Sequence, residues 1–402
     1  MVPRMVPKGC LLKRAEFIYI YVRSPTSGFE SFLLSANATI AIEAMRVPFY
    51  LTPALFPLVL VALFFIGPWW QLVLILLVCR VAFGVYTRPK QTPKPLPCFK
   101  SGGSAGPLMF MIHGWPDDHH VWDAQVAHFG KRYRTVTIDL PHYGSSSEEA
   151  GNWWGYDQDE LVARCAVTLE KSLAEAGQRH AVLVVHDWGA FLGMQLQRRY
   201  PTLVSHLVVI DVVWPSAQPA RLSQLPLLVF LGVFYQYWLA LSWVIATGVP
   251  IVGAALGTAM TRLMMLSAGP PASSLDVRKN ALSASMNFMY FYHHWITLGE
   301  MLGLLPGFDA RHGTKDAPVP TLFFYAADKG FMFHPESFVH NLLQRTDCGV
   351  VKVDRTKNGG NRVGHWVQVT AAAVVNTEMD AWLPCPSLPA GATRKPVADL
   401  MS

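Results

Sequence analysis

The sequence predicts an α/β fold, in which helices cover both faces of a mostly parallel sheet. Along the 402 residues, short apolar runs alternate with segments whose apolar residues recur at helical spacing. Several of the apolar runs end in polar, glycine-containing turns, as parallel strands do before a crossover helix. A long charge-free stretch between two of the later runs indicates an inserted helical lid, and another near the N-terminus indicates a membrane segment.

Six strands follow from the apolar runs, and four main helices follow from the helical spacing. The strands are expected at 108–112, 134–138, 181–185, 207–210, 321–325 and 350–353. The helices are expected at 157–175, 190–200, 335–344 and from about 366 to 382.

The overall composition favours a membrane-associated protein. Hydrophobic residues make up 51% of the chain and charged residues only 15%. The formal charge of +6 is dispersed, with no arginine stripe interleaved with aromatics, so no nucleic-acid partner is predicted. The six cysteines form no C-x-x-C pair, which argues against a zinc site or a disulfide framework and favours a reducing compartment.

The proposed membrane segment lies at residues 47–86. Val47 to Cys79 carries no charge and is long enough to cross a bilayer once. Two interpretations remain: a single kinked span, roughly Leu58 to Cys79, or a re-entrant hairpin turning at Gly67-Pro68. The single span is favoured because Pro53 and Pro57 weaken the first half as a helix.

Basic residues after this segment predict its orientation. Arg80, Arg88, Lys90, Lys94 and Lys100 follow it, whereas the upstream flank offers only Arg46 against Glu43. The positive-inside rule then puts the C-terminal domain in the cytosol, on the endoplasmic reticulum or another internal membrane.

The remaining boundaries follow from composition. Residues 1–46 have no recognisable fold, and residues 87–107 are rich in Pro, Lys, Gly and Ser and predict a linker. The core is expected at 108–213 and 315–385, the lid at 214–314 and a tail at 386–402. Within the lid, Leu222 to Thr261 is charge-free and predicts apolar helices resting on the bilayer surface.

The segment Val185-His186-Asp187-Trp188-Gly189 lies between a predicted strand and a predicted helix. This is the context of a nucleophile elbow, and the nucleophile position holds the carboxylate of Asp187. A carboxylate that attacks an alkyl carbon forms an ordinary ester, which water can cleave. Its attack on an ester would give an anhydride, so the elbow argues against an esterase or lipase. The competing interpretation of Asp187 is a simple helix N-cap.

Four motifs in order resemble the epoxide hydrolase and haloalkane dehalogenase branch of the α/β-hydrolase fold. They are His113-Gly114-Trp115-Pro116-Asp117, Asp139-Leu140-Pro141 with Tyr143-Gly144, His186-Asp187-Trp188-Gly189, and Gly364-His365-Trp366. The resemblance covers roughly Leu108 to Leu383, and with the preceding span it is similar to membrane-anchored epoxide hydrolases. It also implies a strand pair before Leu108, for which the Pro-rich linker is a poor source.

The resemblance implies a catalytic triad. His365 would be the general base that activates water against the enzyme ester. The orienting acid is either Asp211, after the strand that follows the elbow helix, or Asp328. The family's usual acid position falls on Gly330, two residues beyond Asp328, so Asp211 is favoured.

The resemblance also implies an oxyanion hole and two lid proton donors. The backbone N–H groups of Trp115 and Trp188 would form the oxyanion hole. Tyr235 matches the first lid tyrosine. The second is expected where Met289 stands, so Tyr290 or Tyr292 would substitute for it. For each tyrosine, plain packing in an apolar lid is the alternative.

The sequence departs from the family pattern at Val185, and it contains two pairs of adjacent histidines. Val185 stands where the family usually has Gly, which crowds the elbow. The pairs His119-His120 and His293-His294 do not complete a metal site, since no carboxylate or cysteine spacing accompanies them. Neither a metal nor a cofactor is predicted.

The sequence therefore predicts a membrane-anchored hydrolase that uses Asp187 through a covalent ester and converts lipophilic epoxides to diols. The alternatives are a haloalkane dehalogenase-type hydrolase and a catalytically silent, lipid-binding member of the fold. The expected partners are a lipophilic small molecule and the membrane, without nucleic acid.

Overall fold

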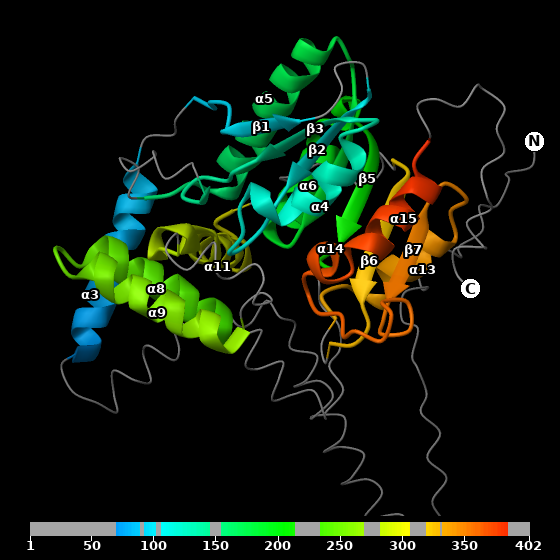
Figure 1. Cartoon of the computed structure of the whole chain (residues 1–402). Helices are drawn as coiled ribbons and strands as arrows, with labels where there is room; N and C mark the ends of the chain where they lie inside the picture. Colours follow the sequence, from blue (N-terminus) through cyan, green and yellow to red (C-terminus); the bar gives the residue numbers. More distant parts are fainter. Residues whose placement is uncertain are drawn as a thin grey trace, which may run out of the picture. The chain divides into compact units, whose positions relative to one another are not determined.

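Seven strands form one sheet in the computed structural model, in the order β1-β3-β2-β4-β5-β6-β7 (Figure 1). All neighbouring strands are parallel except β1, which pairs antiparallel with β3 at one edge. The strands are β1 Cys98–Ser101, β2 Leu108–Ile112, β3 Arg134–Ile138, β4 Ala181–His186, β5 Val204–Ile210, β6 Thr321–Ala326 and β7 Gly349–Val353.

The structure describes eight stretches of the chain, and all of them lie within one compact unit, Pro48–Ser402. They are residues 70–88, 92–101, 106–144, 154–213, 234–268, 282–305, 319–329 and 332–384.

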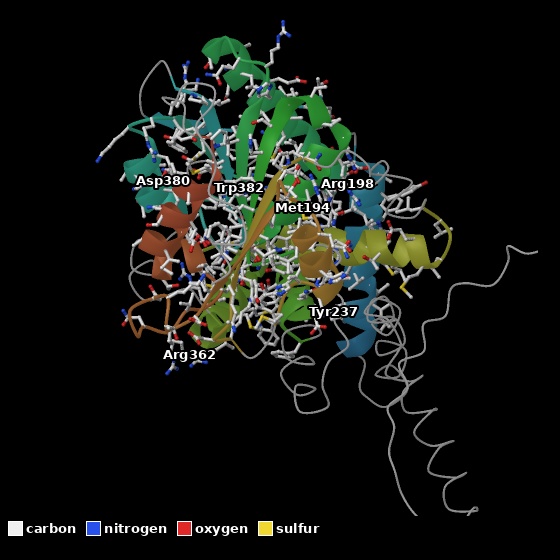
Figure 2. All side chains as sticks on the ribbon, turned by 90° about the vertical axis from the view of Figure 1, so that its right-hand side faces the viewer. Met194, Arg198, Tyr237, Arg362, Asp380 and Trp382 are labelled. Atoms are coloured by element: carbon white, nitrogen blue, oxygen red, sulfur yellow. The ribbon has the colours of Figure 1, made fainter. Side chains whose placement is uncertain are left out.

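Helices cover both faces of the sheet, because successive strand residues point to opposite sides. In β2, Phe110 and Ile112 belong to one apolar cluster, whereas Met109 and Met111 belong to another. The first cluster packs against α5 (Gln158–Ala176), α6 (Trp188–Arg199) and α13 (Glu336–Leu343). The second packs against α4 (Asp123–Phe129), α14 (Val367–Thr370) and α15 (Ala372–Trp382). Figure 2 shows the two layers, with Met194 and Arg198 of α6 on one side of the strands and Asp380 and Trp382 of α15 on the other.

Helix α5 illustrates how local sequence sets an element's start. Asp157 accepts a hydrogen bond from the Glu160 amide at 2.8 Å, and the Glu160 carboxylate accepts from the Asp157 amide at 2.9 Å. This capping box satisfies two amides that the first helical turn leaves without partners. The helix therefore begins at Gln158, one residue after the predicted start.

Several helices lie between β5 and β6 in the chain, in the segment expected to form the lid. Its described helices are α8 (Tyr235–Gly248), α9 (Gly253–Ala268), the short 3₁₀ helix η6 (Ala284–Asn287) and α11 (Phe288–Met301). Trp243 of α8 packs on Phe291 of α11, with ring centroids 4.8 Å apart, inside the first apolar cluster. These lid residues belong to the same apolar cluster as the first face of the sheet.

Helix α3 (Trp70–Thr87) packs against the lid helix α8. Leu77 and Val81 lie against Gly248, and Arg80 Nη1 donates to the Gly248 carbonyl at 2.8 Å, at the C-terminal end of α8. Helix α3 covers the last part of the segment predicted as membrane-spanning, and residues 47–69 lie outside the described residues. Within the described stretches, no helix combines the length and the apolar character needed to cross a bilayer.

Two predictions of secondary structure differ from the structure. The segment 87–107, predicted as a linker, contains the edge strand β1. This strand is four residues long and includes Lys100 and Ser101, so it lacks the apolar run of a central strand. The single helix predicted from Trp366 to Trp382 is divided into α14 and α15 at Ala371, whose φ of −131° and ψ of 40° are not helical.

Candidate active site

Asp187 lies at the sharp turn between β4 and α6. Its φ of 53° is rare for a residue with a side chain, and it leaves the carboxylate at the carboxyl end of the sheet. Gly114, after β2, makes this turn possible. A Cβ atom at Gly114 would overlap the Asp187 carboxylate and lie 2.6 Å from the Trp188 nitrogen. The two motifs that contain Gly114 and Asp187 are therefore packed directly on each other.

Val185 fits at the elbow because residue 193 has no side chain. An added Cβ at Gly193 of α6 would overlap Val185 Cγ1 and lie 3.3 Å from Val185 Cβ. The crowding expected from Val185 is thus relieved one turn into the following helix.

The two oxygens of Asp187 have different surroundings. Oδ2 accepts a hydrogen bond from the Trp115 backbone N–H at 2.7 Å, and the Trp188 backbone N–H also bonds the carboxylate. Oδ1 lies 3.5 Å from His365 Nε2. Burial alone would raise the pKa of Asp187, but the hydrogen bonds from His365 and Trp188 hold it below its ordinary value. The group is therefore an ionised carboxylate with one oxygen in a backbone N–H cradle.

His365 lies between two carboxylates. Its Nδ1 is 2.7 Å from Asp211 Oδ2, on the side opposite Asp187. Burial disfavours the imidazolium, but hydrogen bonds to Asp187 and Asp211 outweigh it and raise the pKa of His365. His186 packs on the His365 ring with centroids 4.5 Å apart, and its Nε2–H donates to the His365 carbonyl at 3.1 Å. The imidazole is therefore oriented from three sides.

Asp211, and not Asp328, contacts His365. Asp211 follows β5 with a φ of 67° and is fully buried, and its Oδ1 accepts from the Ala326 amide at 3.1 Å. Asp328 instead accepts from the Val363 amide at 3.2 Å and organises a loop. The favoured of the two candidate acids is the one beside the imidazole.

Sequence reasoning missed Lys329. Its Nζ forms a short ion pair with Asp211 Oδ2, the same oxygen that faces His365, and it lies 4.7 Å from the centre of the Phe333 ring. Burial lowers the pKa of Lys329, and the charge of Asp211 opposes that shift. A lysine next to a glycine after a strand is indistinguishable in sequence from a solvated turn, so no local signal marks it.

Two of the three candidate lid tyrosines are paired. The hydroxyls of Tyr235 on α8 and Tyr290 on α11 form a short hydrogen bond. Burial raises the pKa of both phenols, and the negative charge of Asp187 raises it further. Tyr292 donates to the Trp154 carbonyl at 2.8 Å and lies under Arg88, so it is part of a different cluster.

Aromatic rings connect this tyrosine pair to the elbow. Trp115 lies edge-on to Tyr235 and Tyr290, at centroid distances of 5.8 Å and 5.9 Å, and Trp188 lies 5.1 Å from Tyr290. The arrangement sets two neutral O–H groups near an ionised carboxylate, inside an apolar, aromatic surrounding.

The Trp115 indole is held by the lid. Its Nε1–H donates to Asn287 Oδ1 at 2.8 Å, and Asn287 Nδ2 donates to the hydroxyls of Ser242 and Thr261, each at 2.7 Å. The sequence gives no local signal for the contacts of Asn287. Its role as an anchor depends on three distant hydroxyl and indole groups that no local pattern predicts.

The described residues contain no group of three or more His, Cys, Asp or Glu side chains arranged to hold a metal. Of the histidine pairs, His119 Nδ1 lies 2.9 Å from Asp139 Oδ1 and its ring stacks on Phe99. His294 stacks on Tyr237, with centroids 4.2 Å apart. His119 and His294, one member of each pair, are therefore held by packing and hydrogen-bond contacts within the fold.

Comparisons with known proteins agree with this geometry. Residues 107–237 match the alpha/beta hydrolase fold family. The chain is 29% identical to mouse epoxide hydrolase 4 over 38% of this chain and 41% of the mouse protein. It is 33% identical to epoxide hydrolase 3 of Xenopus tropicalis over 33% of this chain and 35% of the frog protein. The matches thus span less than half the length of these curated relatives.

A solved structure shows the same fold. The haloalkane dehalogenase DbeA-M1 loop variant from Bradyrhizobium elkanii superimposes with a TM-score of 0.53 and 16% identity, over 71% of this chain and 91% of that one. The sheet order, the elbow between β4 and α6, and the sequence matches lead to one conclusion. The chain is an α/β-hydrolase-fold protein similar to the epoxide hydrolases.

Proposed function

We propose that this protein hydrolyses lipophilic epoxides to vicinal diols through a covalent ester on Asp187. The observation that carries the proposal is the hydroxyl pair of Tyr235 and Tyr290 near the elbow carboxylate. Opening an epoxide produces an alkoxide, which needs a donor that is protonated at neutral pH, and a buried phenol meets that need.

In the first step, Asp187 Oδ1 attacks an epoxide carbon and the carbon–oxygen bond of the ring breaks. The pair Tyr235–Tyr290 receives the developing alkoxide and supplies its proton. Oδ1 is the attacking atom in this scheme because Oδ2 is held by the Trp115 amide. Esterification removes the charge of Asp187, which is one of the causes that raise the pKa of both phenols.

In the second step, His365 takes a proton from water, and the hydroxide attacks Cγ of the Asp187 ester. Negative charge then develops on Oδ2, where the Trp115 N–H already lies, and the Trp188 N–H also bonds this carboxyl group. The tetrahedral intermediate collapses by breaking the Cγ–Oδ1 bond. The alcohol leaves with Oδ1 and takes the proton held by His365, and the oxygen of water stays in Asp187. The proton left on the new Asp187 carboxyl returns to the phenolate of the tyrosine pair, which restores the carboxylate and both phenols. Asp211 supports the imidazolium throughout.

The halide-binding alternative has less support. A haloalkane dehalogenase needs N–H donors directed at the leaving halide, but the Trp115 indole N–H is committed to Asn287. Two phenolic hydroxyls in the lid suit an alkoxide better than a halide. The epoxide substrate is therefore favoured over the haloalkane.

We further propose that the protein acts at an internal membrane, with its catalytic domain in the cytosol. Val47 to Cys79 is free of charge. Among the described residues, large apolar side chains are exposed on α3 and around α9, including Leu76 at 59%, Phe83 at 69% and Ile251 at 100%. This distribution supports a lipid-facing side and a lipophilic substrate. Flotation of the full chain with phosphatidylcholine vesicles tests this part, and a chain that stays with the soluble fraction argues against it.

The mechanism is tested by single turnover of para-nitrostyrene oxide in heavy-oxygen water, with the enzyme in excess. Mass spectrometry of the peptide that contains Asp187 should show one heavy oxygen, and Asp187→Asn should show neither label nor diol. Halide release from 1-bromohexane without epoxide opening would favour the dehalogenase. An unlabelled Asp187 with both substrates, and equal vesicle binding by wild type and Asp187→Ala, would favour a silent lipid-binding protein.

A further inference from the structure

One oxygen of the triad acid is shared by two basic groups. Asp211 Oδ2 faces His365 Nδ1 at 2.7 Å and also accepts the short ion pair from Lys329 Nζ. The side chain of Asp211 is fully buried and that of Lys329 is 12% exposed, so water screens this contact poorly. The base His365 and Lys329 therefore share one oxygen of the same buried carboxylate.

The charge balance around the imidazole changes during the proposed reaction. In the resting protein, Asp187 and Asp211 both face His365, and two carboxylates favour the imidazolium. Once Asp187 is an ester, only Asp211 remains ionised beside the ring. Without a further cation, that carboxylate would still favour the imidazolium, which cannot take a proton from water.

We propose that Lys329 is a positioning residue that acts through Asp211 and keeps His365 unprotonated in the ester intermediate. The proposal rests on the proposed function and deepens it. The positive charge of Lys329 offsets part of the charge of Asp211, while the shared oxygen still orients Nδ1–H of the imidazole. The ring then keeps the tautomer in which Nε2 is free to accept a proton.

The other titratable groups near this cluster do not replace Lys329. His186 from β4 lies on the His365 ring, and burial lowers its pKa to about 3. His334, beyond Phe333, is influenced by Lys329 and Asp211, and burial lowers its pKa to about 4. Both rings are neutral at physiological pH. Phe333 contacts both groups, because its ring centre is 4.7 Å from Lys329 Nζ and 5.4 Å from the centroid of the His365 ring. A phenyl ring carries no net charge.

The decisive experiment needs no substrate. Asp187→Asn replaces the carboxylate by a neutral group, as esterification does, and the pKa of His365 is measured in it by NMR titration of ¹⁵N-labelled histidine. His365→Gln identifies the signal by its loss. Adding Lys329→Gln, which keeps a donor but removes the charge, should raise the pKa of His365 by about 1–3 pH units, the effect expected of a charge at this range.

Three further variants complete the test. Lys329→Met should raise the pKa of His365 as Lys329→Gln does. With two such variants, the test can still be made if one of them does not fold. Lys329→Arg should keep the pKa near that of the parent. Lys131→Met, at an exposed lysine after α4, should leave it unchanged. An unchanged His365 pKa in a folded Lys329→Gln or Lys329→Met protein overturns the proposal.

The kinetic consequence is measured separately, in single turnover of para-nitrostyrene oxide. In Lys329→Gln, the acidic limb of the rate of ester hydrolysis should move to higher pH by the same shift, with ester formation little changed. A protein that opens no epoxide but shows the shifted titration refutes the proposed function and leaves the electrostatic role of Lys329 standing. A protein that opens the epoxide but shows no shift in the His365 titration supports the proposed function and refutes the electrostatic role of Lys329.

Discussion

Asn287 of the lid binds the indole of Trp115, whose own backbone amide binds the carboxylate of Asp187. The two distances are 2.8 Å for the indole and 2.7 Å for the amide. A single residue thus connects the oxyanion cradle in the core to the buried hydroxyls of Ser242 and Thr261 in the lid. The position of the lid and the geometry of the cradle are therefore coupled through Trp115.

Asn287→Leu tests this coupling. The substitution leaves the indole N–H without its acceptor and removes the donor to two hydroxyls in a fully buried place. We expect the free energy of unfolding to fall by about 1–3 kcal/mol, measured by urea denaturation. Ester hydrolysis should slow more than ester formation, because negative charge develops on Oδ2 in the cradle only in the second step, whereas the first step removes the carboxylate charge from it.

Asn341→Leu is the matched control, since Asn341 is exposed on α13. It should change the unfolding free energy by less than about 0.5 kcal/mol and leave both rates as they are. Equal effects of the two substitutions would contradict the coupling.

Gly193→Ala tests the packing that admits Val185. The added methyl group overlaps Val185 Cγ1 and lies 3.3 Å from Val185 Cβ, so one of the two elements must shift. We expect a loss of about 1–3 kcal/mol in urea unfolding, as for overpacked cores. Adding Val185→Ala should restore most of that loss, and a double-mutant cycle with no coupling energy would show that the two side chains do not compete.

Substitutions of the lid tyrosines distinguish the role of Tyr290 from that of Tyr292 on the same helix, α11. Tyr235→Phe and Tyr290→Phe should each slow the formation of the Asp187 ester, by about 10²-fold or more, because the alkoxide loses a proton donor. Stopped-flow single turnover of para-nitrostyrene oxide measures this step. Tyr292→Phe removes the hydrogen bond to Trp154 and the contact of the hydroxyl with Arg88, both outside the tyrosine pair, and should leave the rate unchanged.

The control Tyr292→Phe should change stability although it leaves the rate unchanged. Tyr292→Phe should lower the free energy of unfolding by about 1 kcal/mol. If it slows ester formation as strongly as Tyr290→Phe, the assignment of Tyr290 to the reaction is wrong.

The sequence predicted what depends on local pattern. Six of the seven strands were predicted within three residues at either end, because central strands such as β2 are continuous apolar runs. The edge strand β1 was missed because Cys98-Phe99-Lys100-Ser101 alternates too little to stand out from a linker. The elbow was recognisable because its short motif directly follows a strand, and His365 because its short motif directly precedes a helix.

Side-chain contacts between distant segments were harder to predict. The sequence left Asp211 and Asp328 as alternatives, because both follow strands and only the packed structure puts one of them 2.7 Å from His365. Lys329 is 118 residues from Asp211, and Asn287 is 172 residues from Trp115. Neither pairing produces a periodic pattern in the sequence. These polar contacts form only when the fold brings the distant segments together.

The raised pKa of His365 predicts how stability changes with pH. A folded-state pKa above the unfolded value of about 6.5 means that the ion pairs of His365 stabilise the protein fully below that pH. The stabilisation is lost as pH rises through the folded-state pKa, where the imidazolium deprotonates. We therefore expect the unfolding free energy of wild type, relative to His365→Gln, to fall as pH rises above about 6.5. Urea titrations at pH 5.5 and pH 9 measure the difference, with Asp211→Asn expected to flatten it because the imidazolium then loses its closest partner. Parallel pH curves for wild type and His365→Gln would mean that Asp187 and Asp211 do not raise the pKa of this histidine.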